Sequence, residues 1–176
     1  MSSLFRYSLT QGKPTEQGCY DSINAAYEYL VNVKHIPKEC IFIFGRSIGS
    51  GPSTDLASRC GADGCAGLIL QSPIESGGRA IFGGFIATIG SCIDIFKNIE
   101  KVDMIEVPVC IMHGEKDSVV PINNGRNLYE RLHARNLAAK PLWIRGRGHN
   151  DMPEMDCLAH CREFITGVIQ AKNDKH

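Results

Sequence analysis

Residues 41–49 read Ile41-Phe-Ile-Phe-Gly-Arg-Ser-Ile-Gly49, an apolar run that leads into a serine between two glycines. A short, wholly apolar run is typical of a parallel strand that is buried on both faces, and residues 50–59 follow with a helical pattern. In a Gly-x-Ser-x-Gly turn between strand and helix, the serine is lifted above the edge of a sheet. We expect glycine at both flanks because larger side chains would clash with neighbouring backbone. Ser47 is therefore a candidate nucleophile, and the alternative is a serine that caps the helix.

Further along the chain, short apolar runs alternate with segments of helical periodicity, which predicts a mostly parallel sheet with helices on both faces. The runs that we expect to form strands are residues 41–44, 66–70, 108–112 and 141–144. The segments that we expect to form helices are residues 16–33, 50–59, 123–132 and 155–169. The last helix should turn one group of apolar residues inward: Leu158, Cys161, Phe164, Ile165 and Val168. Residues 75–99 are glycine-rich and irregular.

Two loops that follow predicted strands carry residues able to activate a serine. A serine hydroxyl needs a base, and the base needs an acid that orients it. Asp117 follows the run at 108–112 and His149 follows the run at 141–144, so both should lie at the same sheet edge as Ser47. Serine, then acid, then histidine is the chain order in which such a sheet presents a triad. We therefore predict that Ser47, Asp117 and His149 form a catalytic triad.

Each of these residues also has an alternative role. Asp117 could be a turn or helix-cap residue, and His149 could be a surface loop histidine. His113 is an alternative base on the same loop as Asp117. Asp151 is an alternative acid, although its place two residues after His149 favours a bond to local backbone. The backbone N–H of Ile48, at the start of a helix, is expected to donate to an oxyanion.

Composition argues against several classes of partner. The 176 residues include 19 basic and 19 acidic side chains, so no net charge favours nucleic acid. The chain has no run of eighteen apolar residues, so we predict no membrane span. The N-terminus lacks the apolar core of a secretory signal. Among eight cysteines there is no Cys-x-x-Cys pair. Cys157, His160 and Cys161 share a helix face, but a structural zinc site needs a second cluster, so we interpret them as buried or half-buried helix residues. We therefore expect no metal, and we expect no cofactor because the triad supplies both the nucleophile and the proton transfer.

Several segments of the chain carry a resemblance to a known family. They are Gly12-Lys-Pro-Thr-Glu16, Ile43-Phe-Gly-Arg-Ser-Ile-Gly49, Asp55-Leu-Ala-Ser-Arg59, Leu70-Gln-Ser-Pro73, residues 108–117 and residues 141–151. In these the chain resembles the α/β-hydrolase domain-containing protein 17 family and the wider Bem46-like hydrolases, from about residue 7 to residue 165. The resemblance implies a single α/β-hydrolase domain over residues 1–176, with a lid-like segment at about 75–99. It also maps Ser47, Asp117 and His149 onto the family's triad.

The chain departs from that family in three ways. Arg46 stands where the family usually has glutamine, and Lys116 lies beside the acid. The family's first strands, one of which leads to the second oxyanion donor, precede the point where this chain begins, as does its lipidated cysteine cluster. We therefore expect a fold that lacks the N-terminal strands, with residues 41–44 at an open sheet edge. Such a chain would be a fragment, or a short form that a partner chain completes.

The resemblance implies hydrolysis of S-palmitoyl groups on proteins, because members of the family remove palmitate from cysteines of membrane-associated proteins. A lipid ester or a peptide is an alternative substrate for the same triad, and a non-catalytic binding module is an alternative of a different class. Residues 81–93 are uncharged and apolar, and could line an acyl-chain groove, touch a bilayer or simply pack in a cap. These expectations imply a cytoplasmic protein with peripheral membrane contact and no nucleic-acid partner.

Overall fold

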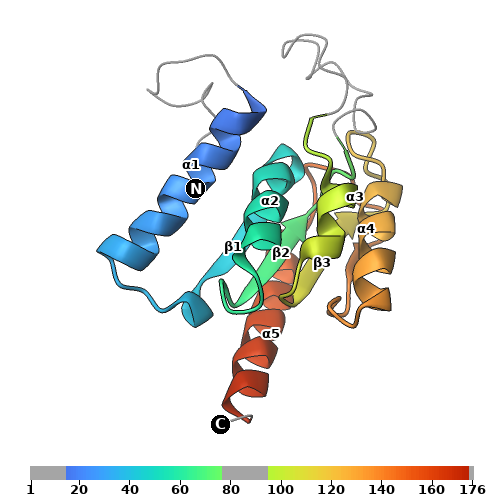
Figure 1. Ribbon diagram of the computed structural model, residues 1–176. Helices are drawn as coiled ribbons and strands as arrows, with labels where there is room; N and C mark the ends of the chain where they lie inside the picture. The colour runs from blue at the N-terminus through green and yellow to red at the C-terminus, as the bar shows by residue number, and fades with distance from the viewer. Residues whose placement is uncertain (1–14, 77–94, 175–176) are drawn as a thin grey trace.

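The computed structural model describes residues 15–76 and 95–174, which contain a four-stranded sheet between layers of helices (Figure 1). The strands are β1 (Phe42–Arg46), β2 (Gly67–Gln71), β3 (Val109–Gly114) and β4 (Leu142–Ile144). They pair in sequence order, and every pair is parallel. This confirms the predicted parallel sheet. The carboxyl ends of all four strands lie along one edge, where open α/β sheets bind ligands.

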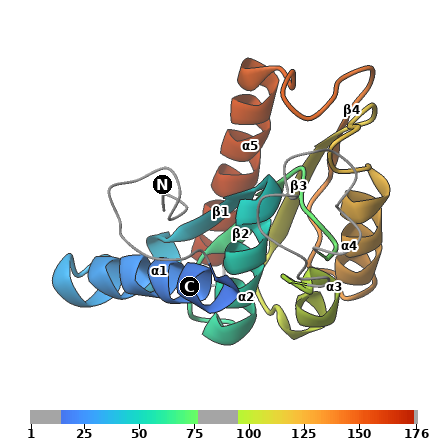
Figure 2. The same cartoon turned by 90° about the horizontal axis from the view of Figure 1, so that it is seen from above.

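Helices cover both faces of the sheet, as Figure 2 shows. One face carries α5 (Glu154–Asn173). The other face carries α1 (Glu16–Glu28), α2 (Ser50–Cys60), α3 (Asn98–Lys101) and α4 (Asn123–Ala134). A π-helical turn (Tyr29–Val33) extends α1, and 3-10 turns span Lys38–Cys40, Ser47–Gly49 and Val102–Met104. The predicted helix at residues 16–33 therefore corresponds to α1 and its π-helical extension.

Two hydrophobic cores form because successive side chains of a strand point to opposite faces of the sheet. Toward α1, α2 and α4, the strands contribute Ile43, Leu68, Leu70, Val109 and Ile111. Toward α5, the strands contribute Ile69, Cys110 and Met112. Burial of a large apolar side chain contributes about 1.5–3 kcal/mol. The apolar runs of the sequence therefore anchor both helix layers.

Strands β1 and β3 extend beyond the apolar runs that predicted them. The run at residues 41–44 becomes β1, which continues through Arg46 opposite Gln71 of β2. The run at residues 108–112 becomes β3, which continues through Gly114 opposite Ile144. Apolar residues indicate where a strand lies, whereas hydrogen bonds to the neighbouring strand decide where it ends.

One prediction about the last helix is wrong. Leu158 was expected to point inward, but its side chain is 56% exposed. The buried residue is its neighbour Cys157, which lies at helical spacing from Cys161 and Phe164 in the core that packs on β2 and β3. One residue along a helix is a rotation of about 100°, which is enough to move a side chain from core to surface.

Within the described residues, β1 pairs only with β2 and its other edge has no neighbouring strand. Phe44 on this strand is 51% exposed. This confirms the expected open edge. The proposed lid-like segment lies mostly outside the described residues, as does the whole apolar stretch at 81–93. None of the described helices has the length and apolarity needed to cross a membrane.

Candidate active site

Ser47 sits in a tight turn between β1 and α2. Its φ is +52°, a backbone conformation that non-glycine residues rarely adopt and that often accompanies function. Gly45 makes this turn sterically feasible. A Cβ placed on it would lie 2.7 Å from Ser53 Oγ and 2.8 Å from the carbonyl oxygen of Gly49. The turn thus holds the serine at the carboxyl edge of the sheet.

The second flanking glycine does not have the predicted role. Gly49 has a helical φ of −64°, and no described atom other than those of its chain neighbours and its own helix backbone lies within 4 Å of a Cβ built on it. The prediction of a clash at this flank is therefore wrong. The turn presses the carbonyl oxygen of Gly49 against Gly45 and leaves the side-chain direction of Gly49 open.

Asp117 lies in the loop after β3, and its side chain accepts hydrogen bonds from the backbone of that loop. Its Oδ1 accepts hydrogen bonds from the N–H groups of Val119 at 2.9 Å and Val120 at 2.7 Å. Asp117 therefore does act as a turn residue, which was its alternative interpretation. The two roles are compatible because the turn uses only Oδ1 and leaves Oδ2 for other donors.

His149 lies in the loop after β4, and glycines allow that loop to approach β3. A Cβ on Gly114 would lie 2.5 Å from the carbonyl oxygen of Arg147, so only glycine permits this approach. Asp151, the alternative acid, accepts a hydrogen bond from the N–H of Gly148. It shapes the loop locally and has no described contact with the ring of His149.

The three predicted side chains meet at this edge. His149 Nε2 lies 2.9 Å from Ser47 Oγ, and His149 Nδ1 lies 2.7 Å from Asp117 Oδ2. The side chain of Asp117 is fully buried, and that of His149 is nearly so. With the Nδ1 proton directed at the carboxylate, Nε2 can accept the proton of the serine hydroxyl.

Burial alone would raise the pKa of Asp117, because a buried carboxylate loses its hydration. Hydrogen bonds from His113, from His149 and from the backbone N–H of Val120 outweigh burial and hold the pKa well below its ordinary value. Asp117 is therefore ionised at neutral pH. It is suited to orient His149 and to stabilise its protonated form.

His113, the alternative base, faces the acid and not the serine. Its side chain is fully buried, and its Nε2 lies 2.8 Å from the carbonyl oxygen of Val120 and 3.3 Å from Asp117 Oδ2. The contact with Asp117 was not predicted. The only signal in the sequence was that His113 and Asp117 are four residues apart at the end of one strand.

Arg46 also makes contacts that the sequence did not reveal. Its Nη2 donates to the carbonyl oxygen of His149 at 3.1 Å and to Asn150 Oδ1 at 3.2 Å. Arg46 is adjacent to Ser47 in the chain, so this side chain links the serine turn to the histidine loop. Its position at the end of β1 gave no hint of this partner more than 100 residues away.

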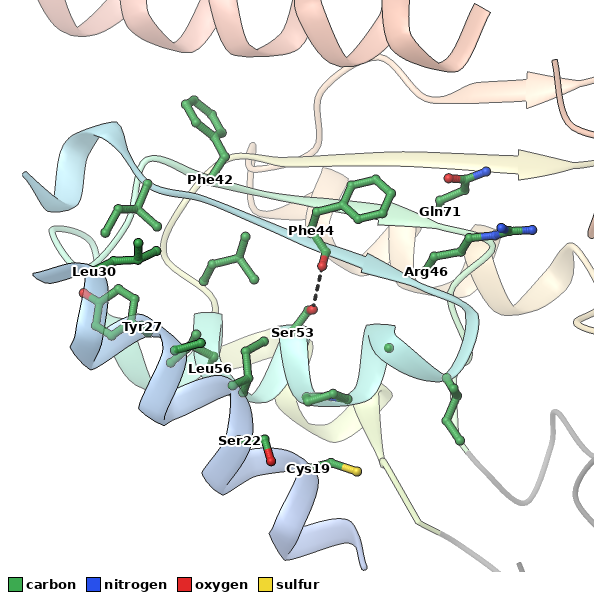
Figure 3. Close-up of a pocket in the computed structure, with 17 residues that line it drawn as sticks. Cys19, Ser22, Tyr27, Leu30, Phe42, Phe44, Arg46, Ser53, Leu56 and Gln71 are labelled. Carbon is green, nitrogen blue, oxygen red and sulfur yellow. Dashed lines mark hydrogen bonds between the residues drawn. The ribbon is translucent and has the colours of Figure 1, made fainter. Parts of the chain in front are cut away.

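A groove of about 710 Å³ runs along the open edge of β1, between that strand, α1 and α2 (Figure 3). Apolar side chains such as Leu30, Phe44 and Leu56 line most of it, and Arg46 and Ile48 line the part nearest Ser47. Ser53 Oγ donates to the carbonyl oxygen of Phe44 at 3.1 Å. Among the described residues, no cluster of three His, Cys, Asp or Glu side chains could hold a metal ion.

No protein-family model matches the chain, but curated relatives do. It is 42% identical over 160 residues to alpha/beta hydrolase domain-containing protein aho-3 of Caenorhabditis elegans, over 90% of this chain and 46% of that protein. It is 39% identical to alpha/beta hydrolase domain-containing protein 17C of Mus musculus, over 91% of this chain and 48% of that protein. It is 41% identical to alpha/beta hydrolase domain-containing protein 17B of Homo sapiens, over 83% of this chain and 48% of that protein. The chain spans about half the length of these relatives, and the resemblance recognised in the sequence is confirmed.

Solved structures of similar fold are esterases, lipases and peptidases. The Paleococcus ferrophilus monoacylglycerol lipase matches with a TM-score of 0.62 and 17% identity, over 91% of this chain and 77% of that chain. Esterase PE8 matches with a TM-score of 0.64 and 17% identity, over 87% and 61%. Porphyromonas gingivalis dipeptidyl peptidase 4 matches with a TM-score of 0.68 and 13% identity, over 90% and 23%. At these identities the likeness shows the fold, which is the α/β-hydrolase fold.

Proposed function

We propose that this chain is a serine hydrolase of acyl thioesters or esters. It has the α/β-hydrolase fold and is homologous to α/β-hydrolase domain-containing proteins. One observation carries this proposal. Ser47, His149 and Asp117 are joined by hydrogen bonds of 2.9 Å and 2.7 Å, although 102 and 32 residues separate them in the chain. That order of contacts is what proton removal from a serine hydroxyl requires.

In the proposed mechanism, Ser47 Oγ attacks the acyl carbonyl carbon while His149 Nε2 takes the hydroxyl proton. Asp117 holds the ring through Nδ1 and stabilises the imidazolium. His149 then gives the proton to the departing thiolate or alkoxide, which leaves an acyl ester on Ser47. Water, deprotonated by His149, attacks this ester. His149 then returns that proton to Ser47 Oγ as the acyl–oxygen bond breaks, which releases the fatty acid and the free serine.

The tetrahedral intermediates of both steps carry a negative oxygen that must be stabilised. We assign one donor to the backbone N–H of Ile48, which follows the nucleophile in the turn Ser47–Gly49 that leads into α2. Helix N-termini favour negative charge, and loss of one oxyanion donor typically costs about 2.7–4 kcal/mol of transition-state stabilisation. A second donor would come from outside the described residues.

For the substrate, we propose an S-palmitoylated protein, with a lipid ester or a peptide as the alternative. The resemblance to the protein 17 family supports the thioester, and the triad by itself is compatible with all three. This substrate would place the chain in the cytoplasm, in peripheral contact with membranes. The competing proposal of a non-catalytic binding module predicts that Ser47 can be replaced without consequence for any measured activity.

The test is labelling by a fluorophosphonate, which forms a covalent bond only with an activated serine. We expect the chain to label and the Ser47→Ala variant not to label, with Ser53→Ala as a matched control that keeps its labelling. Circular dichroism on each protein shows whether the chain is folded. Hydrolysis of palmitoyl thioester, palmitoyl ester and peptide substrates then ranks the three substrate classes. A folded chain that does not label would overturn the proposal and support the binding module.

A further inference from the structure

His113 is a buried histidine in direct contact with the loop that carries Asp117. It is the second-last residue of β3, where the strand passes into this loop. Its Nε2 lies 2.8 Å from the carbonyl oxygen of Val120, while the N–H of Val120 donates to Asp117 Oδ1 at 2.7 Å. The carbonyl oxygen of Val120 is therefore bound by the histidine, and its N–H is bound by the carboxylate.

The other ring nitrogen of His113 decides where its proton resides. Nδ1 is buried and has no hydrogen-bond partner among the described residues. It faces Gly125 of α4, and a Cβ on that glycine would lie only 2.6 Å from it. A proton on Nδ1 would be buried without an acceptor, which is costly. Nε2, in contrast, faces two oxygen acceptors, so the neutral ring with its proton on Nε2 is the form that this pocket accommodates.

The same ring nitrogen also lies close to the carboxylate oxygen that binds His149. His113 Nε2 lies 3.3 Å from Asp117 Oδ2, and His149 Nδ1 lies 2.7 Å from it. The carboxylate is therefore held on four sides, by two backbone N–H groups on Oδ1 and by two histidines on Oδ2. Of the two histidines described at this carboxylate, His113 is the one that also contacts the backbone of the turn.

We propose that His113 is a positioning residue for Asp117, whose Nε2–H ties the Val120 carbonyl to the carboxylate and so aims Oδ2 at His149. This rests on the proposed serine hydrolase function. His113 does not touch the serine or a substrate bound there. Its removal should let the Asp117 carboxylate rotate, so that His149 loses its orientation in the transition state while substrate binding is unchanged.

The experiment compares two replacements of His113 in the same chain. In His113→Gln, the amide nitrogen of glutamine lies near the place of Nε2 and keeps a donor; in His113→Leu, the volume stays similar and the donor is lost. For hydrolysis of a p-nitrophenyl ester, we expect kcat of the leucine variant to fall about 10- to 100-fold with KM nearly unchanged, because a charge-assisted contact is lost. The glutamine variant should recover most of this loss.

Two controls separate positioning from general damage to the fold. Val109→Ala removes core volume from the other end of β3, where Val109 is fully buried, and should leave kcat unchanged. Gly125→Ala adds a methyl group against His113 Nδ1 and favours the helical conformation of α4, so it should lower kcat without unfolding the chain. An effect of Gly125→Ala reports on the ring even if His113→Leu does not fold.

A second readout does not depend on turnover. The proton between His149 Nδ1 and Asp117 should give a low-field NMR resonance that moves or broadens in His113→Leu and persists in His113→Gln. If the unmodified chain shows the resonance but no hydrolysis, the proposed function fails while the positioning role is still measured. The positioning role is overturned if the resonance is missing or does not change in His113→Leu, or if kcat of His113→Leu equals that of Val109→Ala.

Discussion

At the scale of single residues, Asp117 shows how one side chain serves both fold and site. Its Oδ1 closes the turn through Val119 and Val120, and its Oδ2 meets His149. The same hydrogen bonds that stabilise the folded loop keep the pKa of the carboxyl group well below its ordinary value. A carboxyl group whose pKa is lowered by folding binds fewer protons in the folded state than in the unfolded state.

This linkage predicts how stability depends on pH. The stabilisation from Asp117 should be fully present above its unfolded-state pKa of about 3.9 and should be lost as the pH falls further, toward the lower folded-state value. We expect Asp117→Asn to lower the free energy of unfolding by about 1–3 kcal/mol at neutral pH. The difference from the unmodified chain should shrink as the pH falls below about 4.

Urea unfolding followed by circular dichroism, repeated from neutral to acidic pH, measures this difference. Asp63→Asn is the matched control because Asp63 is exposed, and its curve should run parallel to that of the unmodified chain at every pH. A deficit for Asp117→Asn that stays constant with pH would mean that the ionised carboxylate contributes nothing beyond its shape.

At the scale of elements, β1 and α2 are joined by a turn whose two glycines are not equivalent. Gly45 is packed against Ser53 and the carbonyl oxygen of Gly49, whereas Gly49 faces open space among the described residues. The Gly-x-Ser-x-Gly pattern identified the turn from sequence, but it treated both glycines alike. Only the packed turn shows which of them lacks room for a side chain, because the clash involves atoms of α2 that fold back on the strand.

This difference predicts opposite results for a matched pair of variants. Gly45→Ala forces a Cβ to within 2.8 Å of two neighbours and should cost about 1–3 kcal/mol of stability. It should also abolish fluorophosphonate labelling of Ser47. Gly49→Ala places its Cβ in open space at a helical φ, so stability should change by less than about 0.5 kcal/mol and labelling should persist.

Urea denaturation and the labelling rate of both variants, measured side by side, provide the comparison. Equal loss in the two variants would indicate that Gly49 packs against atoms beyond the described residues. Equal tolerance would show that the turn relaxes around a side chain at position 45.

At the scale of the whole molecule, β1 has one edge that pairs with no other described strand. One side of β1 pairs with β2, and the other side faces the groove with Phe44 half exposed. An unpaired strand edge with apolar side chains is a template for pairing with another chain. Such edges are rare in stable proteins because they promote association.

We therefore predict that the chain self-associates through this edge in a concentration-dependent way. Phe44→Thr keeps a residue that favours strands but removes the apolar surface, and should shift the chain toward monomer in sedimentation velocity. Leu158→Thr on α5 is the control, because Leu158 is about as exposed as Phe44 but lies on a helix. If the Leu158 variant dissociates as much as the Phe44 variant, general surface hydrophobicity and not the strand edge drives association.

The sequence by itself determined the alternation of strands and helices, the serine turn, and the order in which serine, acid and histidine follow strand ends. These features depend on local periodicity and on glycine, which act within a few residues and so can be recognised in the chain. Tertiary structure alone decided that His113 contacts Asp117, that Arg46 reaches the His149 loop, and that Leu158 is exposed. Those outcomes depend on strand register, loop path and helix rotation, which are set by packing between residues far apart in sequence.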